Sequence, residues 1–456
     1  MSAEAGGDLR RVIGFWGGTA VIVGITIGSG IFRKPQTLAG LVPDAVVILS
    51  LWTAFGLISL CGALALAELA SMLPRTGGPY VFIHAAYGPA AAFVFGWLYL
   101  LVATPAAIGA LATFFAELLL DLAGPVGTGR RDPAAIATLA SVTIAVLTAV
   151  NLRGTRLGTA VQGTLTVLKV SAILLVVSAA VVAGGSFAHL AERSRTGIEA
   201  DAVGRAAASV IWAYDGWIAV SMVAGEVVGA ERRMQHIVVA GMLVIVLLYL
   251  GANVAYFYAM PVGAMAATTA GVPQWIAARA MGPAGAALIS VLILCSVFGA
   301  LNGNILAKPR VSFALSRDGL TFGFLGRAHP SWSTPHAAIL IQCAGAVALV
   351  WLLRDFDRIT TYYVVVEWAA LLFAVGAVFV LRRHRPDAPR PFRTPGYPLV
   401  PAVFLLGTLA GLAAILWGEI DQPTPNYAPV WGLLLSLAGF PAYVLWRRGV
   451  DPRVFR

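Results

Sequence analysis

Charged side chains are scarce in this sequence. Aspartate, glutamate, lysine and arginine make up 11% of the 456 residues, whereas soluble domains carry about 25%. Hydrophobic residues make up 59%, and the mean hydropathy is +0.84. This balance excludes a soluble globular protein. The formal net charge of +10 does not indicate a nucleic-acid-binding protein either, because the basic residues flank apolar segments instead of gathering in one patch.

Cysteine is also scarce. Cys61, Cys295 and Cys343 all fall within apolar segments, where we interpret them as small packing residues and not as disulfide partners or metal ligands. A cleavable signal peptide is not expected. The first apolar run follows Arg10 and Arg11, exceeds the usual length of a signal core and lacks a convincing cleavage site, so we expect it to remain as the first span.

Motifs for catalysis and for nucleotide hydrolysis are missing. The sequence has no GxxxxGK[ST] phosphate loop, which argues against ATP-driven pumping. The six histidines are scattered near predicted segment ends and lack metal-ligand spacing. Three glutamates, Glu68, Glu117 and Glu367, lie near span ends or in helices, and we interpret them as structural. We therefore expect no enzyme activity, no metal and no cofactor.

Long apolar stretches recur from residue 12 to residue 446, each about the 20 residues needed to cross a bilayer. We predict an all-α polytopic membrane protein with twelve spans, at residues 12–38, 44–70, 88–120, 133–151, 158–184, 204–228, 236–261, 284–308, 336–353, 359–381, 398–418 and 428–446. A short helix is expected at 271–281, and the proline- and arginine-rich segment 382–401 is expected to be a loop.

The basic residues predict the orientation of the chain. Segments on the side of the N-terminus carry about twice as many lysines and arginines as those on the other side. We therefore expect both termini in the cytoplasm. We predict that the protein is integral to the cell (inner) membrane.

One lysine lies at membrane depth. Lys169 stands near the middle of the fifth predicted span, in GTLTVLKVSAILLVV. Charged groups at this depth usually face a protein interior or a water-filled cavity. A lysine that snorkels to the headgroups is the alternative, although Lys169 is far from both ends of the span. We interpret it as a fixed or titratable cation beside a central cavity.

Two spans carry residues that weaken a helix. The first contains VGITIGSGIF (23–32), and the sixth contains IWAYDGW (211–217), with Asp215 and Gly216 in an apolar run. Paired interrupted helices in secondary transporters indicate a substrate site at the midplane. Freed N–H groups attract a carboxylate and freed carbonyls attract an ammonium group, so two facing breaks suit a zwitterion. A simple glycine kink is the alternative for the sixth span.

Four local patterns resemble the amino acid–polyamine–organocation transporter superfamily, most closely its L-type and cationic-type amino acid permease branches. They are VGITIGSGIFRKP (23–35), LPRTGGPYVFIHAAYGP (73–89), AYDGWIAVSMVAGEVVGAERRM (213–234), and NILAKPRVSFALSRDGL with AHPSWSTP (304–335). The resemblance implies a single transmembrane domain with the leucine-transporter-like fold. Two inverted five-helix repeats, 12–184 and 204–381, would be followed by two further helices at 398–446, although no strong self-similarity is visible in the residues.

The resemblance also implies a substrate site. Its residues would be Ile25, Thr26, Ile27, Gly28, Ser29, Gly30, Ala213, Tyr214, Asp215, Gly216 and Trp217. Gly28, Ser29 and Gly30 would hold the carboxylate. Carbonyls near Ile25, Ala213 and Tyr214 would receive the amino group, and Trp217 would line or gate the side-chain pocket. Lys169 matches a lysine that takes the place of a bound sodium ion in sodium-independent members.

The resulting expectation is a sodium-independent secondary transporter of neutral L-amino acids, working by alternating access as an exchanger or a proton-coupled symporter. A carrier of cationic amino acids or polyamines is the alternative if Asp215 or Glu226 faces the pocket. An amino-acid sensor that binds without transport is another. The expected partners are the amino acid and the lipid bilayer, with a monomer or weak homo-oligomer. A disulfide-linked heavy chain is not expected, because no cysteine lies in a predicted outside loop.

Overall fold

The structure, a computed structural model, describes residues 9, 11–123, 132–194, 197–353 and 356–448. The α-helices in this part of the chain are α1 (Phe15–Thr26), α2 (Gly30–Leu41), α3 (Ala45–Met72), α4 (Pro79–Tyr87), α5 (Pro89–Leu98), α6 (Thr104–Ala123), α7 (Pro133–Leu152), α8 (Thr155–Ala183), α9 (Ala200–Tyr214), α10 (Ala219–Met222), α11 (Ala230–Ala259), α12 (Val262–Ala267), α13 (Val272–Ala307), α14 (Pro309–Arg317), α15 (His336–Leu353), α16 (Phe356–His384), α17 (Leu399–Ile420), α18 (Ala428–Leu437) and α19 (Gly439–Arg448). Short 3₁₀ or π turns form η1 (Tyr99–Ala103), η2 (Phe187–Ala191), η3 (Ala224–Glu226) and η4 (Gly323–Gly326). The predicted all-α class is confirmed.

Eleven stretches of the described chain are long and apolar enough to cross a membrane. The sixth predicted span, at residues 204–228, is not among these stretches because it is interrupted: α9 ends at Tyr214 after 15 residues, and only the short α10 and η3 follow. The predicted short helix at 271–281 is present as the first part of α13. The chain leaves helical geometry there at Gly282, where φ is +69°.

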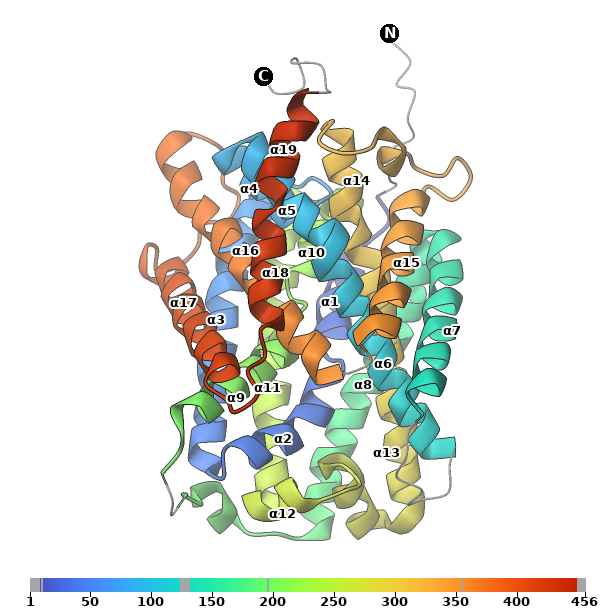
Figure 1. The fold of residues 1–456 in the computed structure, drawn as a ribbon, viewed down its shortest axis with the longest axis vertical. Coiled ribbons are helices and arrows are strands. Elements are labelled where there is room, and N and C mark those ends of the chain that lie inside the picture. The colour runs from blue at the N-terminus through green and yellow to red at the C-terminus, as the bar shows by residue number, and fades with distance from the viewer. Residues whose placement is uncertain (1–8, 10, 124–131, 195–196, 354–355, 449–456) are drawn as a thin grey trace.

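The helices form a bundle along the long axis of the molecule (Figure 1). We call the end at which α4, α14 and α19 lie the α14 end (upper in Figure 1), and the opposite end, with α2 and α12, the α12 end. Inside the bundle, α1 packs against α8, α11 and α13, while α2 packs against α9 and α12. The helix that contains the first predicted break is therefore enclosed by protein. The division into two repeats stays a prediction.

Large apolar side chains cover outward faces of the bundle. Leu247 of α11, Val182 of α8 and Leu406 of α17 are among the most exposed, at about 70% each. Such side chains on long apolar helices are suited to lipid and poorly suited to water. The protein is an integral membrane protein.

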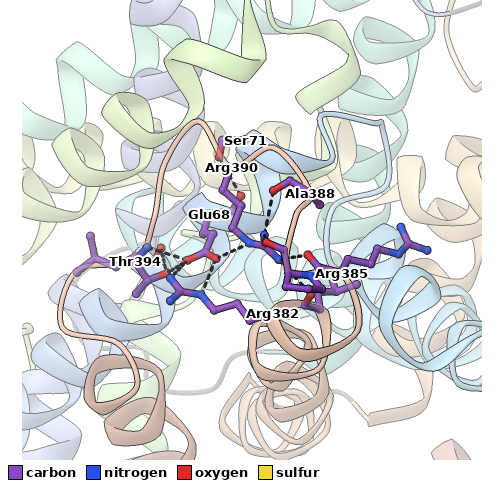
Figure 2. Close-up of polar contacts among 10 residues, drawn as sticks. Glu68, Ser71, Arg382, Arg385, Ala388, Arg390 and Thr394 are labelled. Carbon is purple, nitrogen blue, oxygen red and sulfur yellow. Dashed lines mark hydrogen bonds and ion pairs between the residues drawn. The ribbon is translucent and has the colours of Figure 1, made fainter.

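A buried carboxylate fastens the segment between α16 and α17 to the rest of the bundle (Figure 2). Glu68, near the end of α3, is 1% exposed. It accepts hydrogen bonds from Arg382 Nε at 2.9 Å and Nη2 at 2.7 Å, and from the backbone N–H and hydroxyl of Thr394, both at 2.7 Å. Arg390 Nε lies 3.4 Å from the same carboxylate. The predicted loop at 382–401 is therefore held in place by one acid.

We expect Glu68→Gln to destabilise the protein. The amide keeps the shape but loses the charge-assisted hydrogen bonds, which we expect to cost about 1–3 kcal/mol. Thermal unfolding of purified protein in detergent micelles should show a lower midpoint, and trypsin should cleave faster within residues 382–393. The control is Glu231→Gln, because Glu231 pairs with Arg11 at 3.9 Å with both side chains about half exposed. Equal midpoints for the two variants would contradict this role of Glu68.

Candidate functional site

The first helix is interrupted where the glycines predicted it. α1 ends at Thr26 and α2 begins at Gly30. The last helical bond of α1 runs from the N–H of Ile27 to the carbonyl of Val23, at 2.9 Å. Within the described part of the chain, the N–H groups of Gly28 and Ser29 donate to no protein acceptor. Unpaired donors at the start of a helix form a site that favours an anion.

Four carbonyl groups around the break are paired with side chains, in contrast to these donors. Side chains of three other helices supply the hydrogen bonds: Lys169 Nζ of α8 donates to Gly24 at 2.5 Å, Tyr249 of α11 to Thr26 at 2.8 Å, Ser296 of α13 to Ile27 at 3.2 Å, and Tyr256 of α11 to Ile31 at 3.3 Å. Backbone groups at membrane depth must find partners within the protein. These four carbonyl groups therefore have partners, whereas the N–H groups of Gly28 and Ser29 have none in the described part of the chain.

The second break lies directly against the first. α9 ends at Tyr214, and the chain turns through Gly216 with φ at +113°. A Cβ atom on Gly216 would lie 3.0 Å from the backbone nitrogen of Thr26, and one on Gly30 would lie 2.4 Å from Cα of Ala213. The hydroxyl of Tyr249 is within hydrogen-bond distance of both the Thr26 and Ala213 carbonyls. The two interrupted helices therefore touch backbone to backbone.

A small cavity lies at this crossing. Its lining consists of Ile25, Thr26, Gly28, Ser29, Gly30, Ala107, Leu111, Trp212, Asp215 and Asn304. Only about 20 Å³ of the space is open to the centre of a water molecule. That room suits one or two waters. In this conformation the cavity is therefore nearly closed.

One tryptophan and one acid shape the cavity from the side of α9. Trp212 donates from Nε1 to the hydroxyl oxygen of Ser29 at 3.0 Å, and its ring meets the rings of Tyr363 and Phe356 edge to face. Asp215 accepts a hydrogen bond from the Tyr363 hydroxyl on Oδ2 at 2.7 Å. Its Oδ1 is buried without a hydrogen-bond partner. The cavity thus has neutral donors on one side and a carboxylate on the other.

Lys169 lies behind the cavity and does not line it. The side chain is fully buried, and its bond to Gly24 places the ammonium group against the last turn of α1. The sequence predicted a buried cation near the first break, and the structure places it there. The ammonium stabilises the end of a helix, where the carbonyl groups carry partial negative charge.

Several predicted site residues lie next to the cavity but outside its lining. Ile27, Ala213 and Gly216 form the backbone contacts described above. Tyr214 packs against Trp52 and Tyr249.

Trp217 and Glu226, two further residues considered for the pocket, also lie outside the cavity lining. Trp217 packs against Phe404 of α17 with ring centroids 6.0 Å apart, so in this structure the tryptophan that lines the cavity is Trp212. Glu226, the other acid considered for the pocket, forms a buried bidentate ion pair with Arg310 of α14. Of the two acids, Asp215 is the one that reaches the cavity.

Sequence reasoning missed residues contributed by helices other than the broken ones. These are Ala107, Leu111 and Asn304 in the lining, and Tyr249 and Ser296 behind it. Ala107 and Leu111 look like any other lipid-span residue. The polar residues within apolar spans, Tyr249 and Asn304, carried a signal that could have been used, because such groups must find partners in the protein.

Comparison with known proteins identifies the family of the chain. The sequence model of the amino acid permease family matches residues 13–438. The chain is 30% identical over 445 residues to the serine/threonine exchanger SteT of Bacillus subtilis, covering 97% of this chain and 98% of that protein. It is 27% identical to the mouse b(0,+)-type amino acid transporter 1, covering 96% and 88%, and 27% identical to the human cystine/glutamate transporter, covering 98% and 88%.

The match over most of the chain shows that it belongs to the amino acid permease family. The resemblance inferred from the four sequence patterns is confirmed. The named relatives are transporters and exchangers. The protein is therefore an amino acid transporter of the membrane and not an enzyme.

We expect Gly30→Ala to disrupt the crossing of the two broken helices. The added methyl would meet backbone atoms of Ala213 at 2.4 Å, and backbone cannot move aside as a flexible side chain does. The free energy of unfolding should fall by about 1–3 kcal/mol, which lowers the unfolding midpoint. Amino acid uptake should be lost. Gly40→Ala is the matched control in the same helix, because nothing lies within 4 Å of its Cβ position. Normal uptake by Gly30→Ala would show that the helices do not need this close approach.

Proposed function

We propose that this amino acid permease is a sodium-independent secondary transporter of neutral L-amino acids, working by alternating access. The observation that carries the proposal is the pair of unpaired N–H groups of Gly28 and Ser29 beside the cavity. A carboxylate satisfies such donors and benefits from the start of α2. The lining residues Ala107, Leu111 and Asn304 are uncharged, which suits a neutral side chain.

The position of Lys169 supports transport without sodium. Its ammonium group already supplies a positive charge to the carbonyl end of α1, at Gly24. A bound sodium ion stabilising the same carbonyl would have to compete with that charge. The alternating-access part of the proposal is supported by ion pairs at both ends of the bundle. Lys34 pairs with Asp357 at the α12 end, and Glu226 pairs with Arg310 at the α14 end.

A carrier of cationic amino acids is the second candidate. The unpartnered Oδ1 of Asp215 favours it, because a carboxylate oxygen beside the cavity suits a positively charged side chain. One relative is named a serine/threonine exchanger and another a large neutral amino acids transporter small subunit. We therefore place neutral substrates first. We propose that the protein lies in the cell (inner) membrane, with its α14 end facing the cytoplasm and both termini on that side.

We also propose that the chain works without a disulfide-linked heavy chain. Cys61 and Cys295 are half-buried within α3 and α13, and Cys343 is buried in α15. None of the three therefore lies in a described loop. A monomer or weak homo-oligomer is the corresponding proposal.

Counterflow in proteoliposomes tests the function. Vesicles preloaded with one unlabelled amino acid are given the labelled form outside, for each of the amino acids, with sodium or potassium as the only cation. We expect transient accumulation of neutral amino acids that is equal in the two salts. A sensor would bind without counterflow. Accumulation that requires sodium, or accumulation of cationic amino acids alone, would contradict the proposal.

Lys169→Ala tests the role of the buried ammonium. Loss of a hydrogen bond to a charged group is worth about 1.5–3 kcal/mol, so uptake should fall by about 10- to 100-fold. Arg279→Ala is the matched control, because exposed Arg279 also donates to the terminal carbonyl of a helix, that of Ala183. The two variants should reach the membrane at equal levels. Uptake by Lys169→Ala at the wild-type rate would remove the assigned role.

A further inference from the structure

A chain of polar side chains leads from the cavity into the bundle. Asp215 Oδ2 accepts from the hydroxyl of Tyr363 at 2.7 Å, and Lys308 Nζ donates to the same hydroxyl oxygen at 2.7 Å. Lys308 Nζ lies 3.5 Å from Oε1 of Glu367, which also accepts a hydrogen bond from the Tyr99 hydroxyl. We call Asp215, Tyr363, Lys308, Glu367 and Tyr99 the acid pair cluster.

The cluster joins four parts of the fold. Asp215 directly follows α9 at the second helix break, and Tyr363 and Glu367 lie one turn apart on α16. Lys308 separates α13 from α14, and Tyr99 begins the π-helical turn η1. Lys308 and Glu367 are 1% and 0% exposed. The cluster therefore connects a cavity-lining carboxylate to two charges that have no contact with solvent.

The charges of the cluster do not balance. Two carboxylates face one ammonium group, so the fully ionised cluster carries one excess negative charge. Other charged or titratable side chains on the neighbouring helices are engaged elsewhere: Glu68 with Arg382 and Arg390, Lys34 with Asp357, Glu226 with Arg310, Glu419 with Asn426, and Tyr80 and Arg75 with Asp318. His84 is on α4, facing Tyr80, and Glu117 on α6 has its own polar contact. No second cation in the described chain contacts the two acids.

Each acid also has one oxygen without a partner. Oδ1 of Asp215 and Oε2 of Glu367 are buried and accept no hydrogen bond from the residues that the structure describes. A buried carboxylate that is neither paired nor fully hydrogen-bonded is strongly unfavourable, and such a group takes up a proton instead. One proton shared by the two acids removes the excess charge. Interacting acids of this kind bind protons as a pair.

We propose that Asp215 and Glu367 form one proton-binding site, loaded from the cavity, which must hold a proton before the cavity closes around a neutral amino acid. The proposal rests on the transport function proposed above and adds its coupling ion. Water in the open cavity delivers the proton to Asp215, and the Tyr363 hydroxyl links that acid to Lys308 and Glu367. The proton returns to water when the cavity opens on the other side.

The physical reason for the coupling is desolvation. Asp215 lines the cavity, so its carboxylate is hydrated when the cavity is open and loses that water when Trp212 closes over Ser29. Removing water from an excess negative charge opposes closure. Protonation makes the cluster neutral and removes this opposition. Transport of a neutral amino acid should then move one proton in the same direction.

Glu367→Gln separates this proposal from the general transport function. The amide is permanently neutral, so the remaining Asp215 and Lys308 balance each other at every pH. Glu367 is 0% exposed and does not line the cavity, so the amino acid contacts remain. Glu419→Gln is the matched control, since Glu419 is 8% exposed and bonds to Asn426 near the end of α17.

The experiment uses proteoliposomes containing the pH dye pyranine and the neutral amino acid with the fastest counterflow. Wild-type uptake should rise as the outside pH is lowered from 8.5 to 5.5, by up to about tenfold per pH unit as one proton is taken up, and the interior should acidify. Glu419→Gln should behave identically. Glu367→Gln should keep counterflow at equal pH, take up substrate independently of pH and give no acidification.

Two results would overturn the proposal while leaving the transport function intact. One is wild-type uptake without acidification. The other is a wild-type pH profile in Glu367→Gln, which would assign the titration to another group such as Lys169. Absence of counterflow by the wild-type protein at equal pH would instead contradict the transport function.

A second measurement applies if Glu367→Gln does not fold. Calorimetric titration of wild-type protein in detergent with the same amino acid, in two buffers of different ionisation enthalpy, counts the protons taken up on binding. Binding of close to one proton for each amino acid bound at pH 8 supports the site. A heat that is independent of the buffer overturns it.

Discussion

Hydrogen bonding of the interrupted backbone of α1 is the constraint on which the rest of this structure depends. A helix that stops in the middle of a membrane protein exposes carbonyl and N–H groups that lipid cannot satisfy. Lys169, Tyr249 and Ser296 bring partners for the carbonyls from α8, α11 and α13. These three helices must therefore pack around α1 in one register. The N–H groups of Gly28 and Ser29 have no protein acceptor in the described part of the chain.

The same constraint explains why the second break lies where it does. Tyr249 bonds to carbonyls of both broken helices, and it can do so only because the backbones at Gly30 and Gly216 approach so closely. A side chain at either glycine would push the helices apart and leave these carbonyls unpaired. The glycines therefore do more than weaken the helices. They let the two breaks share one small cavity, which Trp212 covers from the side of α9.

The buried charges divide into two kinds. Glu226 and Glu68 are bonded through both carboxylate oxygens, and Lys169 donates to the Gly24 carbonyl, so these three groups fix the positions of neighbouring helices. Asp215 and Glu367 each keep an unpartnered oxygen and share a single ammonium group. In a low-dielectric interior, complete pairing favours one rigid arrangement, whereas incomplete pairing makes a group sensitive to protons and ligands. This difference underlies the proposed role of Asp215 and Glu367 in binding a proton.

The sequence by itself determined the class of the protein, the two weak points in its first and sixth spans, and the buried position of Lys169. Apolar length, glycine content and a charge at membrane depth are local properties, so they can be read along the chain. It did not determine that Trp212 and not Trp217 lines the cavity, or that Ala107, Leu111 and Asn304 complete it. The tertiary structure decided these points, and also that Lys308 contacts Glu367 directly and is linked to Asp215 through the Tyr363 hydroxyl. Which residues from distant spans face one another depends on the rotation and packing of whole helices, and that information is spread over all their contacts.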